Sequence, residues 1–150
     1  MSRQALSPPQ ADVLRAFAGT MIPASTRHGV PGADDPAILA DILANLERDH
    51  DDVVAALQRL DGLAGGSFVA LDGAQRLAVA HEFRAEGGAP LAALSRVVLL
   101  CYYRDDRVMR ALGQEPRPPF PLGHAVEQGD WSLLDPVRRR APFWRRPPRG

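Results

Sequence analysis

The side chains with the most direct capacity for acid–base chemistry are the neighbours His81 and Glu82. An imidazole beside a carboxylate can exchange protons near neutral pH, as it does in many enzymes. Both residues also fit the partly exposed polar face of a helix, because the apolar residues around them recur at helical spacing. We favour the polar face and predict no catalytic residue in this chain. Turnover by the purified protein, abolished by mutation of His81, would indicate an enzyme instead.

A second cluster of titratable groups is the run ERDHDD at residues 47–52, where His50 stands among Asp49, Asp51 and Asp52. Carboxylates with a histidine suggest a site for a hard metal ion. Consecutive residues of a helix point in different directions, so these carboxylates could converge on one ion only if the helix unwound. We therefore predict a solvated charged turn and no metal site.

Cys101 is the only cysteine among the 150 residues. A single thiol forms no internal disulfide and no thiolate cluster for zinc. Leucines and tyrosines surround it in the sequence and offer nothing to lower its pKa, so we predict a small core residue. The chain also has no phosphate-binding glycine loop and no GxSxG, HExxH or CxxC motif. We expect no cofactor in this chain.

The elements that carry these residues are predicted to be helices. Apolar residues recur near every 3.6 positions through the first 113 residues, and no alternating run of strand length occurs. Helix caps are expected at Ser7, at Asp34 or Asp35, and at Asp72 and Asp105. The predicted helices cover about residues 7–22, 36–63, 72–86, 91–103 and 105–112. The fold class is therefore all-α, a compact bundle of about five helices.

The segment 36–63 leaves two alternatives open, because the charged run 47–52 interrupts its apolar period. Either one helix exposes that turn to solvent, or two helices meet there. We favour a single helix, kinked at most. The uncharged run 97–103 is expected in the middle of the helical core, because a solvated helix would show a polar face. The run is also far too short to span a membrane, which takes about 20 apolar residues.

Beyond Gly113 the sequence becomes rich in proline and no longer shows helical spacing of apolar residues. Four prolines within six positions fix φ and remove backbone donors, which predicts an extended, polyproline-like arm. They are Pro116, Pro118, Pro119 and Pro121. We divide the chain into a helical domain, residues 1–113, and an extended arm with an irregular Arg/Trp-rich tail, residues 114–150, within a single domain overall.

Charge is unevenly distributed along a chain whose formal net charge is zero. Residues 136–150 contain six arginines and no acidic residue, so the preceding part carries a formal charge of −6. This tail suggests an alternative function, a small nucleic-acid-binding protein whose arginines neutralise phosphates while Trp144 stacks on a base. The body is acidic and shows no helix-turn-helix or strand platform, so we expect a protein partner and no nucleic acid.

Aromatic residues mark the expected contact with that partner. Trp131, Phe143 and Trp144 are three of nine Phe, Trp and Tyr residues, and they lie beyond the last predicted core helix. Large aromatics and arginines anchor many protein interfaces because they bury much area with little loss of side-chain entropy. The alternative is a tail folded back over its own helices. The predicted partner-binding residues are Tyr102, Tyr103, Pro118, Pro119, Phe120, Trp131, Arg138, Arg139, Phe143 and Trp144.

The N-terminal segment contains prolines and no apolar run of secretory length, so we expect neither a signal peptide nor a twin-arginine leader. No membrane span is expected either. The predicted location is the cytoplasm, or the periplasm only if a partner carries the chain across the membrane.

Several short motifs follow one another in a characteristic order. They are FAGTMIP at 17–23, VPGADDP at 30–36, GSFVALDGAQR at 66–76, YYRDDRVMRALG at 102–113 and PPFPLG at 118–123. In combination they resemble the small, or gamma, subunit of gluconate 2-dehydrogenase and related flavin dehydrogenases. The resemblance covers about residues 10–125. The chain departs from many members in lacking a twin-arginine leader, which suggests a cytoplasmic complex or export directed by another subunit.

The resemblance to this family, gluconate 2-dehydrogenase subunit 3, implies a non-catalytic helical subunit. Such a subunit binds and stabilises a large flavoprotein of the glucose-methanol-choline type and aids its maturation. The partner would hold FAD and remove hydride from an alcohol carbon of a sugar or polyol, with a cytochrome c subunit as a further partner. This chain would contribute surface only.

Overall fold

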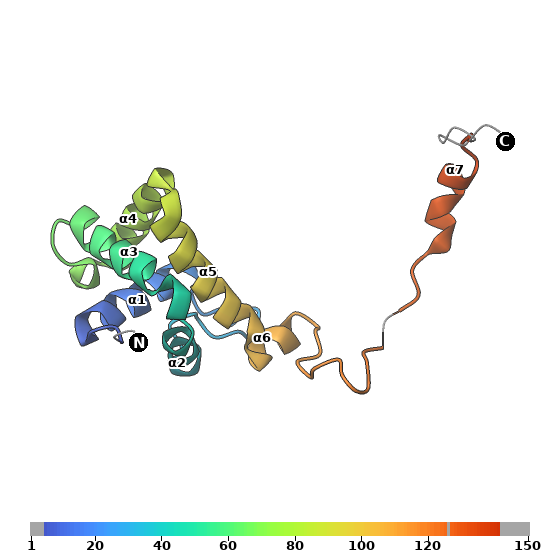
Figure 1. Ribbon diagram of the computed structural model, residues 1–150, viewed down its shortest axis with the longest axis horizontal. Coiled ribbons are helices and arrows are strands. Elements are labelled where there is room, and N and C mark those ends of the chain that lie inside the picture. The colour runs from blue at the N-terminus through green and yellow to red at the C-terminus, as the bar shows by residue number, and fades with distance from the viewer. Residues whose placement is uncertain (1–4, 126, 142–150) are drawn as a thin grey trace, which may run out of the picture. The chain divides into compact units, whose positions relative to one another are not determined.

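The computed structural model describes residues 5–125 and 127–141 of the chain (Figure 1). Those residues form seven α-helices and three short 3-10 helices, and they contain no β-strand, only an isolated bridge between Ser25 and Val30. The predicted all-α fold is confirmed. The chain divides into two compact units, residues 1–117 and 118–150, so the division falls four residues beyond the predicted position.

Four helices of the first unit begin directly after residues that the sequence indicates as caps, namely Ser7, Asp35, Asp72 and Asp105. Helix α1 (Pro8–Met21) follows Ser7, whose backbone N–H donates to the Gln10 side chain at 2.9 Å. At α4 (Gly73–Glu86) the Asp72 carboxylate accepts from the Gln75 N–H at 2.9 Å, and the Gln75 side chain accepts from the Asp72 N–H at 3.0 Å. These reciprocal bonds satisfy backbone donors that a helix terminus would otherwise leave open.

The segment 36–63 contains two helices, so the prediction of one is wrong. Helix α2 (Pro36–Ala44) ends at Asn45, which leaves the helical conformation with φ −115° and ψ 20°. A 3-10 turn, η1 (Glu47–Asp49), then leads into α3 (His50–Leu63). The physical reason is Asp49, whose side chain is buried and accepts hydrogen bonds from Arg96 of α5 (Gly88–Arg104), a contact that a solvated turn of one continuous helix would not make.

The connection between α1 and α2 packs tightly against the end of α1. The Ala33 N–H donates to the Ile22 carbonyl at 2.9 Å, which brings VPGADDP beside FAGTMIP. A Cβ on Gly32 would lie 2.3 Å from the Asp34 carboxylate oxygen and 3.0 Å from the Ala24 nitrogen. Glycine is therefore required at position 32 by close approach, since no side chain fits there.

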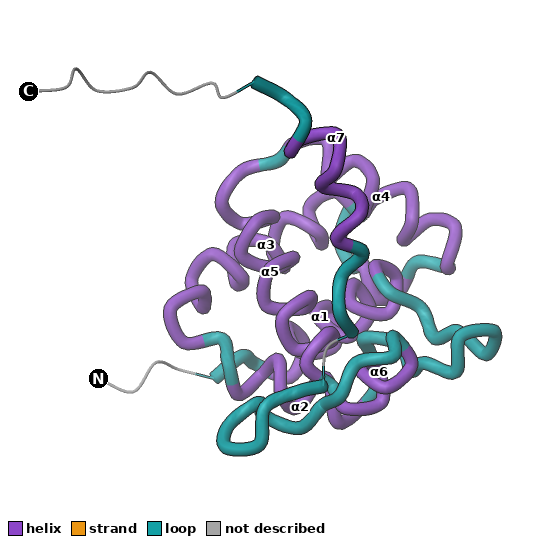
Figure 2. Tube along the Cα trace, turned by 90° about the vertical axis from the view of Figure 1, so that its right-hand side faces the viewer, coloured by secondary structure: helices purple, strands orange, loops and turns teal. Residues whose placement is uncertain are grey.

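Helix α5 (Gly88–Arg104) is the longest element and begins a few residues before its predicted start. Gly87 and Gly88 have φ angles of 70° and 89°, a conformation that favours glycine and lets the chain turn from α4 directly into α5. Helix α3 packs against α5, α4 and α1, α1 packs against α4, and α2 packs against α5 (Figure 2). Helix α6 (Asp106–Ala111) follows α5 and ends before Gly113.

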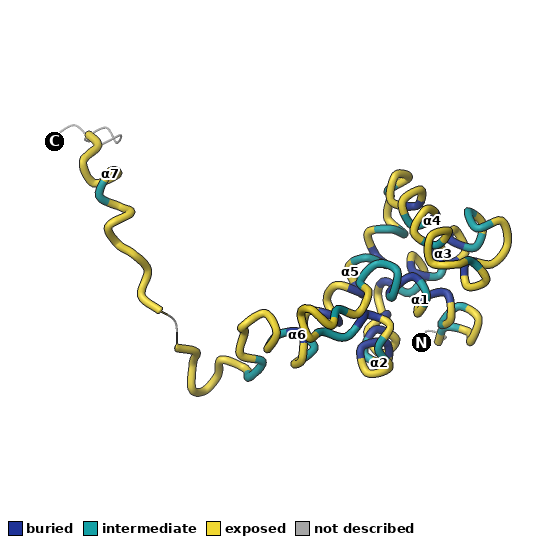
Figure 3. The backbone as a smooth tube through the Cα atoms, turned by 180° about the vertical axis from the view of Figure 1, so that it is seen from behind, coloured by how far each residue is buried: buried dark blue, intermediate teal, exposed yellow. Residues whose placement is uncertain are grey.

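The core lies where these helices meet, and its buried residues come from every helix of the first unit (Figure 3). Its aromatic centre joins three elements. The Phe17 ring of α1 lies 6.5 Å from Phe68 in the 3-10 turn η2 (Phe68–Ala70) and 6.2 Å, edge-on, from Phe83 of α4. Edge-on packing places the positive ring edge against a negative ring face, which adds to the gain from burial.

The second unit differs from the predicted extended arm and irregular tail in two places. Residues 120–122 form a turn, where the Gly123 N–H donates to the Pro119 carbonyl. Residues Trp131–Leu134 form a 3-10 helix, η3, which leads directly into α7 (Asp135–Arg138). The Asp130 carboxylate caps this segment by accepting from the Ser132 N–H at 3.0 Å. Within this unit no described residue is buried (Figure 3).

In the part of the chain that the structure describes, no helix has both the length and the apolar character that crossing a membrane requires.

Candidate partner-binding surface

The solvent-facing side of α5 carries an apolar surface that we call the α5 stripe, made of Leu99, Leu100 and Tyr103. Their exposed fractions are 37%, 59% and 53%. The stripe lines a shallow hollow of about 600 Å³ together with Arg96 and Arg104. Because the opposite side of α5 is buried in the core, this helix is apolar both toward the core and toward solvent. A helix at the surface ordinarily presents polar residues there.

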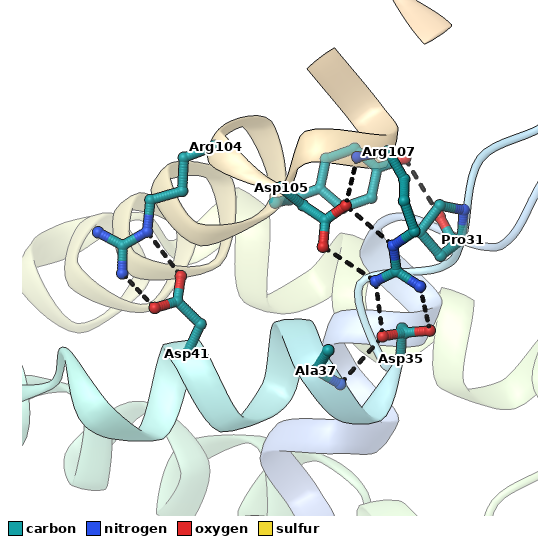
Figure 4. A network of polar contacts seen from close by, with 8 residues as sticks. Pro31, Asp35, Ala37, Asp41, Arg104, Asp105 and Arg107 are labelled. Atoms are coloured by element: carbon teal, nitrogen blue, oxygen red, sulfur yellow. Dashed lines mark hydrogen bonds and ion pairs between the residues drawn. The ribbon is translucent and has the colours of Figure 1, made fainter. Parts of the chain in front are cut away.

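The two arginines beside the α5 stripe are held by carboxylates from other elements. Arg96 binds Asp49 of η1 through two nitrogens, at 3.2 Å and 2.5 Å. Arg104 binds Asp41 of α2 in the same two-pronged way, at 2.6 Å and 2.5 Å (Figure 4). Paired N–H donors of a guanidinium match a carboxylate in direction as well as charge. The edges of the stripe are therefore fixed before any partner binds, which lowers the entropy cost of binding.

A third arginine joins the ends of two helices. Arg107 binds Asp35, the cap of α2, at 2.8 Å and 3.0 Å, and also Asp105, the cap of α6, at 2.9 Å (Figure 4). Both carboxylates also accept backbone N–H bonds at their helix ends. The hydrogen bonds from Arg107 hold the pKa of each carboxyl below its usual range. Arg107 thereby joins the start of α6 to the start of α2.

The charged turn 47–52 is not uniformly solvated, so that prediction is wrong for Asp49. This residue is 8% exposed, and its hydrogen bond with Arg96 holds its pKa below the usual range, against the opposing effect of burial. His50 Nδ1 lies 2.9 Å from an Asp51 oxygen. Among the described residues, no three His, Cys, Asp or Glu side chains are grouped so that they could hold a metal ion.

We expect Asp49→Asn to reduce stability most at neutral pH. A carboxyl with a folded pKa below its unfolded value stabilises the fold above the unfolded pKa of about 3.9, and this gain disappears as pH falls through the folded pKa. Urea unfolding at pH 7 should show a loss of about 1 kcal/mol, shrinking toward pH 3. Asp106→Asn is the control, since its pair with Arg110 is well exposed and should matter by about 0.5 kcal/mol or less. An equal loss for Asp49→Asn at both pH values would contradict the expectation.

Tyr102 and Tyr103 are adjacent in the sequence but differ in burial and in their contacts. Tyr102 is only 4% exposed, and its hydroxyl donates to the Pro31 carbonyl at 3.2 Å. Burial, followed by the neighbouring Tyr103 and Asp105, raises the pKa of its phenol. The Tyr103 ring stands edge-on to it at 5.2 Å and faces solvent. Tyr102 therefore belongs to the core, and of the two predicted contact tyrosines only Tyr103 remains in the candidate surface.

Tyr102→Phe should lower the free energy of unfolding by about 1 kcal/mol, because the Pro31 carbonyl loses its donor in a part-buried position. Tyr103→Phe should leave it unchanged within error, since its hydroxyl is at the surface. Thermal and urea unfolding of both variants measure the difference. Equal stability of the two variants would show that the Tyr102 hydroxyl contributes nothing.

The remaining predicted contact residues belong to the second unit. Pro118, Pro119 and Phe120 are exposed, Phe120 by 87%, and Trp131 is 62% exposed with its indole N–H 3.4 Å from the Gln128 side chain. Arg138 pairs with the Asp135 carboxylate at 3.4 Å, and Arg139 donates to the Asp135 carbonyl at 3.3 Å. Phe143 and Trp144 lie outside the described residues. Leu122 and Leu133, which sequence reasoning missed, are exposed by 80% and 73%.

The residues that first suggested chemistry lie on different elements: His81 and Glu82 on α4, Asp49 in η1 and Cys101 on α5. Cys101 is 1% exposed, and burial, followed by the nearby Asp41, raises the pKa of its thiol to about 11. That position agrees with the expected core role, because a thiol so hard to ionise is a poor nucleophile. His81 is exposed on α4 and lines a groove between α1, α4 and α5.

Comparison with known proteins does not identify a family: no family model matches the chain, and neither a curated protein nor a solved structure matches it. The resemblance to the small subunit of gluconate 2-dehydrogenase stays a prediction based on the motifs.

Proposed function

We propose that this chain is a non-catalytic subunit that binds and stabilises a larger flavoprotein dehydrogenase. The observation that supports this most is the α5 stripe, an apolar surface facing solvent between two arginines that are already held in place. A tyrosine, leucines and fixed arginines at one location are typical of the centre of a protein interface. A reaction site would instead need converging polar groups, which this surface lacks.

The motif resemblance supports the choice of partner. The partner is a flavoprotein of the glucose-methanol-choline type that holds FAD and oxidises an alcohol carbon of a sugar or polyol. A cytochrome c subunit can complete the complex. The chain acts in the cytoplasm, or beyond it when the flavoprotein carries it there. Binding only the folded flavoprotein would stabilise it by mass action, which accounts for a role in maturation without any reaction.

Area considerations indicate that the α5 stripe is only part of the contact. A permanent interface buries on the order of 2,000 Å² or more in total, which exceeds what three side chains supply. The second unit offers further exposed apolar side chains to a partner, including Phe120, Leu122 and Trp131. Their exposure within their own unit is the expected state of residues that are covered in a complex.

The test is co-expression with a flavoprotein of this type from the same genome. We expect the two to co-purify, and the flavoprotein expressed alone to give less soluble, FAD-loaded protein. A chain ending at Asp135 should show reduced co-purification if the tail takes part. A monomeric chain that leaves flavoprotein yield unchanged would refute the proposal. Binding of DNA or RNA that weakens steeply with salt and disappears in the shortened chain would favour the nucleic-acid alternative.

A further inference from the structure

A groove of about 400 Å³ lies between α1, α4 and α5. Its walls are mostly apolar and include Phe17, Met21, Leu77 and Leu91. Leu77 is 49% exposed although it points into this groove, so a bound side chain would remove substantial apolar area from water. The groove is open to solvent along its length, whereas a small-molecule site usually encloses most of its ligand, so the groove suits a side chain presented from a protein surface.

Arg84 places a positive charge at the rim of the groove. Arg84 and His81 line it from successive turns of α4. Neither has an ion-pair partner within residues 5–125 and 127–141, whereas Arg96, Arg104 and Arg107 are all bound to carboxylates. An unpaired guanidinium beside an apolar groove is complementary to a ligand that combines an apolar group with a carboxylate.

The groove and the α5 stripe are two separate hollows that both use residues of α5. Leu91 and Ser95 line the groove, and Leu99 and Tyr103 belong to the stripe. These four residues follow one another at intervals of four along α5, which places them in one row on the helix surface. The row extends about 18 Å at 1.5 Å per residue. A partner bound at the stripe would therefore have chain within reach of the groove.

We propose that the groove receives a short peptide segment of the flavoprotein, in which an apolar side chain stands within a few residues of an Asp or Glu. The apolar side chain enters between Leu77 and Leu91, and the carboxylate pairs with Arg84. This inference rests on the proposed function and specifies part of its interface. Apolar area supplies affinity at the groove, and the charge pair selects the segment and its direction.

Photo-crosslinking of the purified complex tests this inference. p-Benzoylphenylalanine is placed at position 77 in the groove or at position 100 in the α5 stripe, and the linked peptides are identified by mass spectrometry. From position 77 we expect a flavoprotein peptide with an acidic residue near the linked apolar residue. Linkage from position 100 alone, or a peptide from position 77 without an acid, would overturn the groove assignment and leave the proposed function intact. No linkage from either position, together with no co-purification, would refute both.

Matched variants provide a second measurement. Leu77→Glu and Arg84→Gln should each raise the Kd for the flavoprotein about tenfold or more, as expected for residues near an interface centre. Ala78→Glu is the control, because it adds the same charge at an exposed position of the same helix outside the groove. Equal weakening by Leu77→Glu and Ala78→Glu would overturn the assignment. Unchanged melting temperatures show that each variant remains folded.

Discussion

Replacing Phe83 by alanine should lower the free energy of unfolding by about 3–5 kcal/mol. Phe83 is 2% exposed and packs edge-on against Phe17, which in turn contacts Phe68. Removing the ring leaves a cavity at the point where α1, η2 and α4 meet, and three separate elements cannot all move in to fill it. A domain of this size is stable by only about 5–15 kcal/mol, so much of its stability would be lost.

Urea unfolding followed by circular dichroism measures this effect. Leu77→Ala is the matched control, because Leu77 belongs to the same helix but is 49% exposed and should cost about 1 kcal/mol or less. A loss for Phe83→Ala no larger than that of the control would mean that the aromatic centre is not where the stability of the bundle resides.

The starts of α1, α2, α4 and α6 were predictable because they depend on local interactions. Asp72 and Gln75 are three residues apart, and their reciprocal hydrogen bonds need only the backbone between them. The same holds for Asp35 and Asp105, each of which accepts the N–H two residues on. A sequence contains all the information that such short-range chemistry requires.

The break between α2 and α3 was not predictable by the same reasoning, because its cause is distant in the sequence. Asp49 and Arg96 are 47 positions apart, and the residues around Asp49 in the sequence do not indicate which arginine it binds. Arg104 with Asp41 and Arg107 with Asp35 are separated by 63 and 72 positions. Charged residues that appear solvated in the sequence thus form ion pairs that connect α2, η1, α5 and α6 in the folded protein.

Within α5, the predicted contact residues and the exposed apolar residues have only Tyr103 in common. The run 97–103 contains no charge, and its composition alone does not separate the core-facing from the solvent-facing positions. Helical spacing does separate them, since Val97, Val98 and Cys101 are buried while Leu99 and Leu100 are not. The groove could not be predicted, because its lining combines residues from three helices that are far apart in the sequence.

Leu100→Glu should raise the Kd for the flavoprotein by about 100-fold or more. Leu100 is 59% exposed, so the free protein accommodates a carboxylate there in water. In the complex the same carboxylate would lose its water in an apolar contact. The two arginines beside the stripe would not compensate for this loss, since Arg96 and Arg104 already bind Asp49 and Asp41. The substitution should therefore weaken binding of the flavoprotein and leave the stability of the free protein unchanged.

The measurement is the affinity of purified variants for the purified flavoprotein, together with the melting temperature of each variant alone. Ala78→Glu is the matched control, with one new carboxylate at an exposed position of α4 and an expected change within about threefold. Tyr103→Ala should weaken binding about 30-fold, because an aromatic anchor is lost without a new charge. If both stripe variants bind as tightly as the control, the partner does not contact this face of α5, since neither change could then be tolerated under a desolvated interface.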